Sequence, residues 1–124
     1  MPKKILIVED EAIISEPFKI ILSSGGYGVK VAGNGHEALE LCKKDRYDLI
    51  LLDIMMPVCN GVEFLEKAKL DTAAPTTKVI IMSNLSSGEE LTEALALGAK
   101  KSILKASVTP KTLLELVAAE LDEA

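Results

Sequence analysis

Several features that define whole classes of protein are scarce or missing in this sequence. The 124 residues include no tryptophan and only 3% aromatic residues, so an aliphatic core of Ile, Leu, Val and Ala is expected. No apolar run approaches the roughly 18–20 residues that span a bilayer. The amino-terminal residues lead directly into a short apolar run, which does not resemble a secretory signal. We therefore expect a cytoplasmic protein with no membrane partner.

Basic residues are also fewer than acidic ones. The 14 basic and 19 acidic residues give a formal net charge of −5, and direct binding of nucleic acid, which needs a basic face, is not expected. The two cysteines, Cys42 and Cys59, lack the spacing of a CxxC or metal-binding motif and are expected to be reduced thiols. The single histidine, His36, has no flanking group that would suit phosphotransfer.

Five short aliphatic runs divide the chain, at residues 5–8, 29–32, 49–52, 79–82 and 103–104. Between them, apolar residues recur every three or four positions, as on the buried face of a helix. This alternation of strand and helix predicts an α/β fold with a parallel sheet covered on both faces. Right-handed crossovers leave few topologies, and we expect the doubly wound strand order 2-1-3-4-5 in one domain over residues 1–124, with no output domain.

Local signals within the helical segments give further expectations. Pro17 is expected to kink the first helix or shift its start. In the fourth helix, Leu91, Ala94 and Leu95 are expected to face inward, and Gly98 is expected to end the helix.

Chemically useful side chains follow four of the five runs. Glu9 and Asp10 follow the first, Asp53 the third, Ser83 the fourth and Lys105 the fifth. Because the carboxyl ends of parallel strands lie at one edge of a sheet, we expect these groups to converge where the first and third strands diverge. Clustered carboxylates require a cation, and oxygen donors suit Mg²⁺ or Mn²⁺. Taken singly, an acidic loop or a strand-ending serine also has an ordinary structural explanation.

Asp53 has the widest chemical range of these residues. A carboxylate at a strand end can be a metal ligand, a nucleophile that takes a phosphoryl group, or both. Lys105 and Ser83 would then be donors to the phosphoryl oxygens, although Lys105 could also merely neutralise the acids.

A set of short motifs occurs in a fixed order along the chain: Val8-Glu9-Asp10-Glu11, Leu52-Asp53-Ile54-Met55-Met56-Pro57 with Asn60-Gly61, Met82-Ser83, Gly98-Ala99 and Lys105. On these motifs the chain resembles the response-regulator receiver domains of two-component signalling along essentially its whole length, which implies a flavodoxin-like (βα)5 three-layer sandwich. The resemblance implies that Asp53 accepts a phosphoryl group from a histidine kinase or phosphotransfer protein.

The resemblance also assigns roles to the neighbouring groups. It implies that Asp10, Asp53 and the backbone carbonyl of Met55 bind Mg²⁺ directly, with Glu9 holding the metal through water. It further implies that Lys105 pairs with the phosphoryl oxygens and that the Ser83 hydroxyl moves to meet them. The movement would repack the face formed by the fourth helix, fifth strand and fifth helix, which a downstream protein would recognise.

Several residues depart from the family pattern. Ser102 stands where an aromatic residue is usual, so we expect weaker or different coupling between the site and the output face. Ala106 replaces a proline that usually follows a cis bond, and because cis costs roughly 3–4 kcal/mol before alanine, a trans bond would put the position of Lys105 in doubt. Asn84 stands where a small residue is common. Neither Met55 nor Leu85 orients an attacking water well, which predicts an acyl phosphate that lasts hours.

The sequence therefore predicts a non-enzymatic signalling switch, either a monomer or a weak dimer, that binds a kinase or phosphotransfer protein and a downstream protein. One alternative is a phosphate-independent binding module, in line with Asn84, Ser102 and Ala106. Another is a Mg²⁺-dependent phosphohydrolase, but that class usually carries a second aspartate where this chain has Met55.

Overall fold

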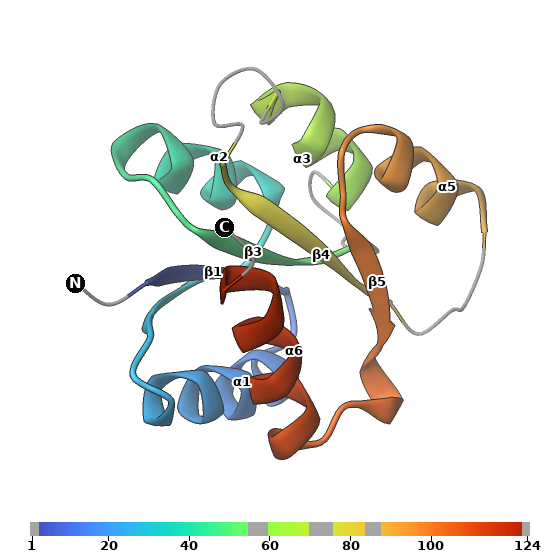
Figure 1. Ribbon diagram of the computed structural model, residues 1–124. Coiled ribbons are helices and arrows are strands. Elements are labelled where there is room, and N and C mark those ends of the chain that lie inside the picture. Colours follow the sequence, from blue (N-terminus) through green and yellow to red (C-terminus); the bar gives the residue numbers. More distant parts are fainter. Residues whose placement is uncertain (1–2, 55–59, 70–75, 84–87, 123–124) are drawn as a thin grey trace.

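A five-stranded sheet forms the centre of the structure, a computed structural model that describes residues 3–54, 60–69, 76–83 and 88–122. Its strands are β1 (Lys4–Val8), β2 (Gly28–Ala32), β3 (Leu49–Asp53), β4 (Lys78–Ser83) and β5 (Lys101–Leu104). Neighbouring strands are parallel and follow the order β2-β1-β3-β4-β5, which confirms the predicted topology (Figure 1).

Helices cover both faces of this sheet. They are α1 (Ala12–Ser24), α2 (Gly35–Lys44), α3 (Gly61–Ala68), α5 (Glu89–Ala96) and α6 (Pro110–Asp122), with a short 3₁₀ turn, η1 (Lys105–Ser107), after β5. Figure 1 shows α1 and α6 on one side of the sheet and α2, α3 and α5 on the other. Among the described residues, no helix is both long enough and apolar enough to cross a membrane.

Successive strand residues point to opposite faces, which divides the core into two layers. One layer packs beneath α2, α3 and α5 and the other against α1 and α6. The central strands are buried on both faces, as their uninterrupted aliphatic runs predict, and full burial of one such side chain contributes about 1.5–3 kcal/mol. The first layer takes Leu6, Val8, Ile50, Leu52, Val79 and Ile81 from the sheet, and the second takes Ile5, Ile7, Leu49, Leu51, Ile80 and Met82.

The helix starts follow from local capping groups. The Asn34 side chain accepts a hydrogen bond from the Glu37 N–H at 2.9 Å, so it caps α2. Asn60 and Glu63 form a reciprocal capping box at the start of α3. In α1 the helix runs through Pro17 from a start at Ala12, so it neither begins nor ends at the proline.

The inward position predicted for Leu95 is wrong, because 42% of this side chain is exposed. Leu91 and Ala94 of α5 are buried as predicted. The helix ends at Ala96, and Leu97 and Ala99 complete its apolar contact with the core in place of Leu95. Gly98 follows the helix end with a φ of 113°, a left-handed conformation that glycine adopts without strain.

Candidate functional site

The carboxyl ends of four strands supply the groups of the site. Asp53 is the last residue of β3, and Ser83 is the last residue of β4. Glu9 directly follows β1, where its N–H donates to the Ala32 carbonyl of β2 at 3.0 Å. Lys105 directly follows β5 and opens η1. The parallel register therefore brings residues that are up to 96 positions apart to one edge of the sheet.

Lys105 joins the two buried acids. Its Nζ lies 2.6 Å from Oε1 of Glu9 and 3.2 Å from Oδ2 of Asp53. Glu9 and Asp53 are each only 2% exposed, whereas Asp10 is exposed at the mouth of the site. Because ionised carboxylates are costly to bury without a partner, one ammonium group here compensates for two of them.

Burial also changes how these groups titrate. Removal from water raises the pKa of Glu9 to about 7, against an opposing effect from the Lys105 hydrogen bond. Burial alone would lower the pKa of Lys105, but the hydrogen bond to Glu9 and the charges of Asp53 and Glu9 outweigh it, and the pKa of Lys105 is raised. The lysine therefore stays protonated, while Glu9 can exchange a proton near neutral pH.

Three carboxylates of this site form a group that suits a hard metal ion. Glu9, Asp10 and Asp53 each offer one oxygen, and these oxygens lie within 4.8 Å of one another. Mg²⁺ and Mn²⁺ prefer such oxygen ligands. Among the described residues, this group of possible metal ligands contains three carboxylates and no histidine or cysteine. The residues present therefore fit a divalent cation.

Of the other predicted site residues, the structure describes Ser83 and Ser102 but not Met55, Asn84 or Leu85. Ser83 is buried, 3% exposed, at the end of the strand beside Asp53. Ser102 is exposed on β5. Met55, Asn84, Leu85 and Cys59 lie outside the described residues.

The peptide bond between Lys105 and Ala106 is trans, since the described residues contain no cis bond. The sequence raised the concern that a trans bond would misplace Lys105. That concern does not apply, because Lys105 contacts both Glu9 and Asp53 with Ala106 lying exposed in η1.

Gly61 approaches the backbone at Asp53 closely, a contact that the sequence did not indicate. A Cβ atom at this position would lie 2.8 Å from Cα of Ile54 and 2.9 Å from the carbonyl oxygen of Asp53. The Gly61 N–H also donates to the Ile54 carbonyl at 3.2 Å. The sequence signal was the Asn60-Gly61 pair, which entered the sequence analysis only as one of the motifs of the family resemblance.

Comparison with known proteins agrees with this geometry. The family model for the response regulator receiver domain matches residues 5–118, and the chain belongs to this family. Chemotaxis protein CheY of Thermotoga maritima is 36% identical over 107 residues, covering 85% of this chain and 87% of that protein. The fold of the chain also matches that of a CheY-like receiver domain from Methanospirillum hungatei, with a TM-score of 0.91, 36% identity and coverage of 99% and 96% of the two chains.

Longer relatives match over only part of their length. The transcriptional regulatory protein CrdR of Helicobacter pylori is 37% identical across 85% of this chain and 49% of that protein. The DNA-binding response regulator MtrA of Mycobacterium tuberculosis is 31% identical across 98% of this chain and 51% of that protein. The chain thus spans about half the length of these curated relatives. The match defines a receiver domain of two-component signalling.

Proposed function

We propose that this chain is a Mg²⁺-dependent phosphoacceptor, in which Asp53 takes a phosphoryl group from the phosphohistidine of a histidine kinase or phosphotransfer protein. The observation that supports this most directly is the position of Lys105, 3.2 Å from Asp53, beside three clustered carboxylates. A carboxylate that accepts a phosphoryl group needs a cation close by, because the carboxylate and the incoming phosphoryl oxygens are all negatively charged.

The chemistry is an exchange of one phosphorus bond for another. A carboxylate oxygen of Asp53 bonds to phosphorus while the phosphorus–nitrogen bond of the donor histidine breaks, which leaves an acyl phosphate and a free imidazole. Two unit charges 4 Å apart repel by about 4 kcal/mol at an effective dielectric constant near 20, so cationic partners matter. Lys105 would pair with the phosphoryl oxygens, and Ser83 would donate a hydrogen bond to them.

A divalent cation would balance the negative charge of the carboxylates and the phosphoryl group that Lys105 alone does not balance. Asp10, Asp53 and the backbone carbonyl of Met55 would hold Mg²⁺ directly, and Glu9 would hold it through water. When bound, this ion supplies positive charge next to the phosphoryl oxygens. Glu9 must be ionised to take part, and its pKa of about 7 makes that requirement sensitive to pH.

The output is proposed to be recognition by another protein. Phosphorylation would change the packing around α5, β5 and α6, and a downstream protein would bind that face. We propose that residues 1–124 act in the cytoplasm as one receiver, a monomer or weak dimer, without enzymatic turnover or direct contact with nucleic acid or membrane. Ser102 in place of an aromatic residue would make the coupling to this face weaker or different.

Intact-mass measurement after incubation with acetyl phosphate and Mg²⁺ tests the proposal. The wild-type chain should gain the mass of one phosphoryl group, whereas Asp53→Asn should not. Omission of Mg²⁺ should reduce the gain strongly. The modified protein should keep its phosphoryl group for hours.

Other outcomes would identify the alternatives. A wild-type chain that gains no mass while its partner still binds would be a phosphate-independent module. Repeated turnover of p-nitrophenyl phosphate would instead indicate a phosphohydrolase. Equal labelling of wild type and Asp53→Asn would show that another residue is the acceptor.

A further inference from the structure

A cavity of about 540 Å³ lies at the amino-terminal edge of the sheet, opposite the edge that carries Asp53. Its walls come from the last turns of α2 and α3, the segment that joins α2 to β3, and Thr77 just before β4. The Thr77 hydroxyl donates to the Tyr47 carbonyl at 2.6 Å and so ties two of these walls together. Ligand sites for small molecules typically have volumes of about 300–1,000 Å³.

The floor of the cavity is apolar and uncharged. Tyr47 and Ile50 are buried, and the other apolar lining residues are partly buried: Leu39, Cys42 and Ala68. Burial raises the pKa of the Cys42 thiol to about 11 and also raises the pKa of Tyr47. Both groups therefore stay neutral at physiological pH, and the floor suits an apolar group of a ligand.

The rim carries an excess of positive charge. Its four cations are Lys43, Lys44, Arg46 and Lys67, and all four are at least partly exposed. Nζ of Lys43 lies 3.4 Å from Oε1 of Glu40. The other three cations, Lys44, Arg46 and Lys67, make no ion pair within the described part of the chain. Three uncompensated cations around one cavity are notable in a protein of net charge −5.

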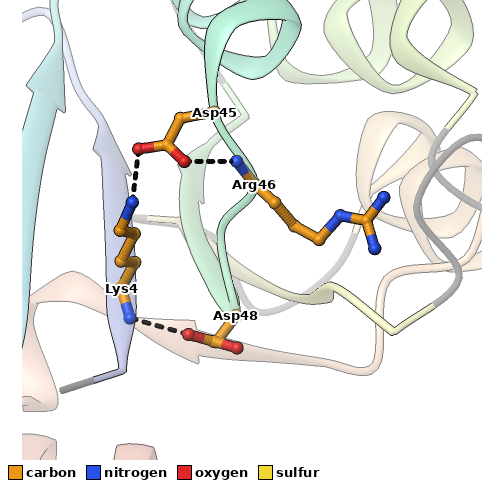
Figure 2. A network of polar contacts seen from close by, with 4 residues as sticks. All are labelled: Lys4, Asp45, Arg46 and Asp48. Carbon is orange, nitrogen blue, oxygen red and sulfur yellow. Dashed lines mark hydrogen bonds and ion pairs between the residues drawn. The ribbon is translucent and has the colours of Figure 1, made fainter. Parts of the chain in front are cut away.

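The acid in the cavity lining does not neutralise this rim. Asp45 accepts from Nζ of Lys4 at 2.6 Å and from the N–H of Arg46 at 2.8 Å. The Lys4 hydrogen bond, together with that of the Arg46 N–H, lowers the pKa of Asp45, so this carboxylate stays ionised and paired. Figure 2 shows the Arg46 side chain extending away from Asp45, which leaves its guanidinium available to a ligand.

We propose that this cavity binds a small molecule with an apolar body and one phosphate, sulfonate or carboxylate group. The apolar body would cover Tyr47 and Ile50, and the anion would lie between Arg46 and Lys67. Guanidinium groups bind such planar or tetrahedral oxyanions through paired hydrogen bonds. The site lies apart from Asp53, so it adds to the proposed phosphoacceptor function and does not depend on it.

Titration with 2-naphthalenesulfonate, followed by amide NMR, tests this site directly. Amide signals of the cavity lining should shift saturably, and neutral 2-naphthalenemethanol should bind at least about fivefold more weakly, because it has the same body without the anion. Arg46→Gln and Lys67→Gln should each raise Kd about two- to fivefold, as expected for single surface charges. Neither side chain belongs to the buried core, so both variants should fold.

Two matched controls separate this site from general charge effects and from the acceptor site. Lys111→Gln removes one exposed cation from α6, on the other side of the sheet, and should leave Kd within about twofold of wild type. Asp53→Asn should bind the probe as wild type does, whatever its phosphorylation result. Equal binding of the neutral probe, equal effects of Lys111→Gln and Arg46→Gln, or shifts confined to other surfaces would overturn the proposal.

Discussion

A single lysine, Lys105, pairs with both buried acids of the candidate site. Glu9 and Asp53 are both buried, and the Lys105 ammonium contacts each of them. The shorter of the two contacts is with Glu9, the residue whose pKa burial raises to about 7. Lys105 thus serves as the counter-ion of the acids, and the proposed phosphorylation would give it a further anionic partner.

Gly61 fixes the chain next to Asp53, and Gly61→Ala tests its importance. The added methyl would meet the backbone of Asp53 and Ile54 at under 3 Å, and backbone atoms cannot give way as side chains do. Overpacking of this kind should cost about 1–3 kcal/mol of unfolding free energy, measured by urea denaturation. The added methyl should also displace the backbone at the end of β3, and this displacement should slow labelling of Asp53 by acetyl phosphate.

Gly33→Ala is the matched control for this prediction. No atom lies within 4 Å of the position that its added methyl would take, and its backbone is not left-handed. Its unfolding free energy should stay within about 0.5 kcal/mol of wild type. Equal losses in the two variants would show that the close approach at Gly61 is unimportant.

At the scale of elements, the sequence predicts what depends on periodicity and on strand order. The aliphatic runs identify the strands, and the rule that parallel strands end at one edge brings Glu9, Asp53 and Lys105 together. Contacts that depend on rotamers or on close backbone approach could not be predicted, and the preference of Lys105 for Glu9 is one example. Leu95 shows a further limit, since a two-turn helix does not bury every residue with the right spacing.

The cationic cavity was missed for a related reason. Lys43, Lys44 and Arg46 belong to α2 and the loop after it, whereas Lys67 belongs to α3, and the whole of β3 lies between these segments in the sequence. Taken locally, each lysine or arginine is an ordinary surface residue in a chain that is acidic overall. Only the folded arrangement collects them around one opening.

The start of α3 offers a prediction about an element as a whole. Asn60 caps this helix by accepting from the Glu63 N–H at 3.0 Å, while Glu63 accepts from the Asn60 N–H at 3.2 Å. Asn60→Ala should therefore lower the unfolding free energy by about 1 kcal/mol, whereas Asn60→Asp should largely retain the cap. Urea denaturation measures both. An aspartate variant as unstable as the alanine variant would argue that the cap contributes little.

At the scale of the whole molecule, acids outnumber cations in the cluster at one edge of the sheet, and cations outnumber acids around the cavity at the other. The carboxyl edge gathers Glu9, Asp10 and Asp53, and the amino edge gathers the cations of the cavity. This arrangement would separate the proposed site for a cation and a phosphoryl group from the proposed site for an organic anion. The buried acid at the first edge should also control how the stability of the entire domain responds to pH.

The metal-free protein should lose stability as pH rises between about 5 and 7. Burial raises the pKa of Glu9 from 4.5 to about 7, so in this range the folded state holds a proton that the unfolded chain has released. Stability from this proton is present at low pH and is lost as pH rises through the folded pKa. Because the proposed Mg²⁺ site requires an ionised Glu9, Mg²⁺ should raise the thermal midpoint more at pH ~7.5 than at pH ~5.5, and Glu9→Gln should abolish that difference. Thermal unfolding at matched ionic strength measures these midpoints, and an equal Mg²⁺ effect at both pH values in the wild-type protein would contradict the role given to Glu9.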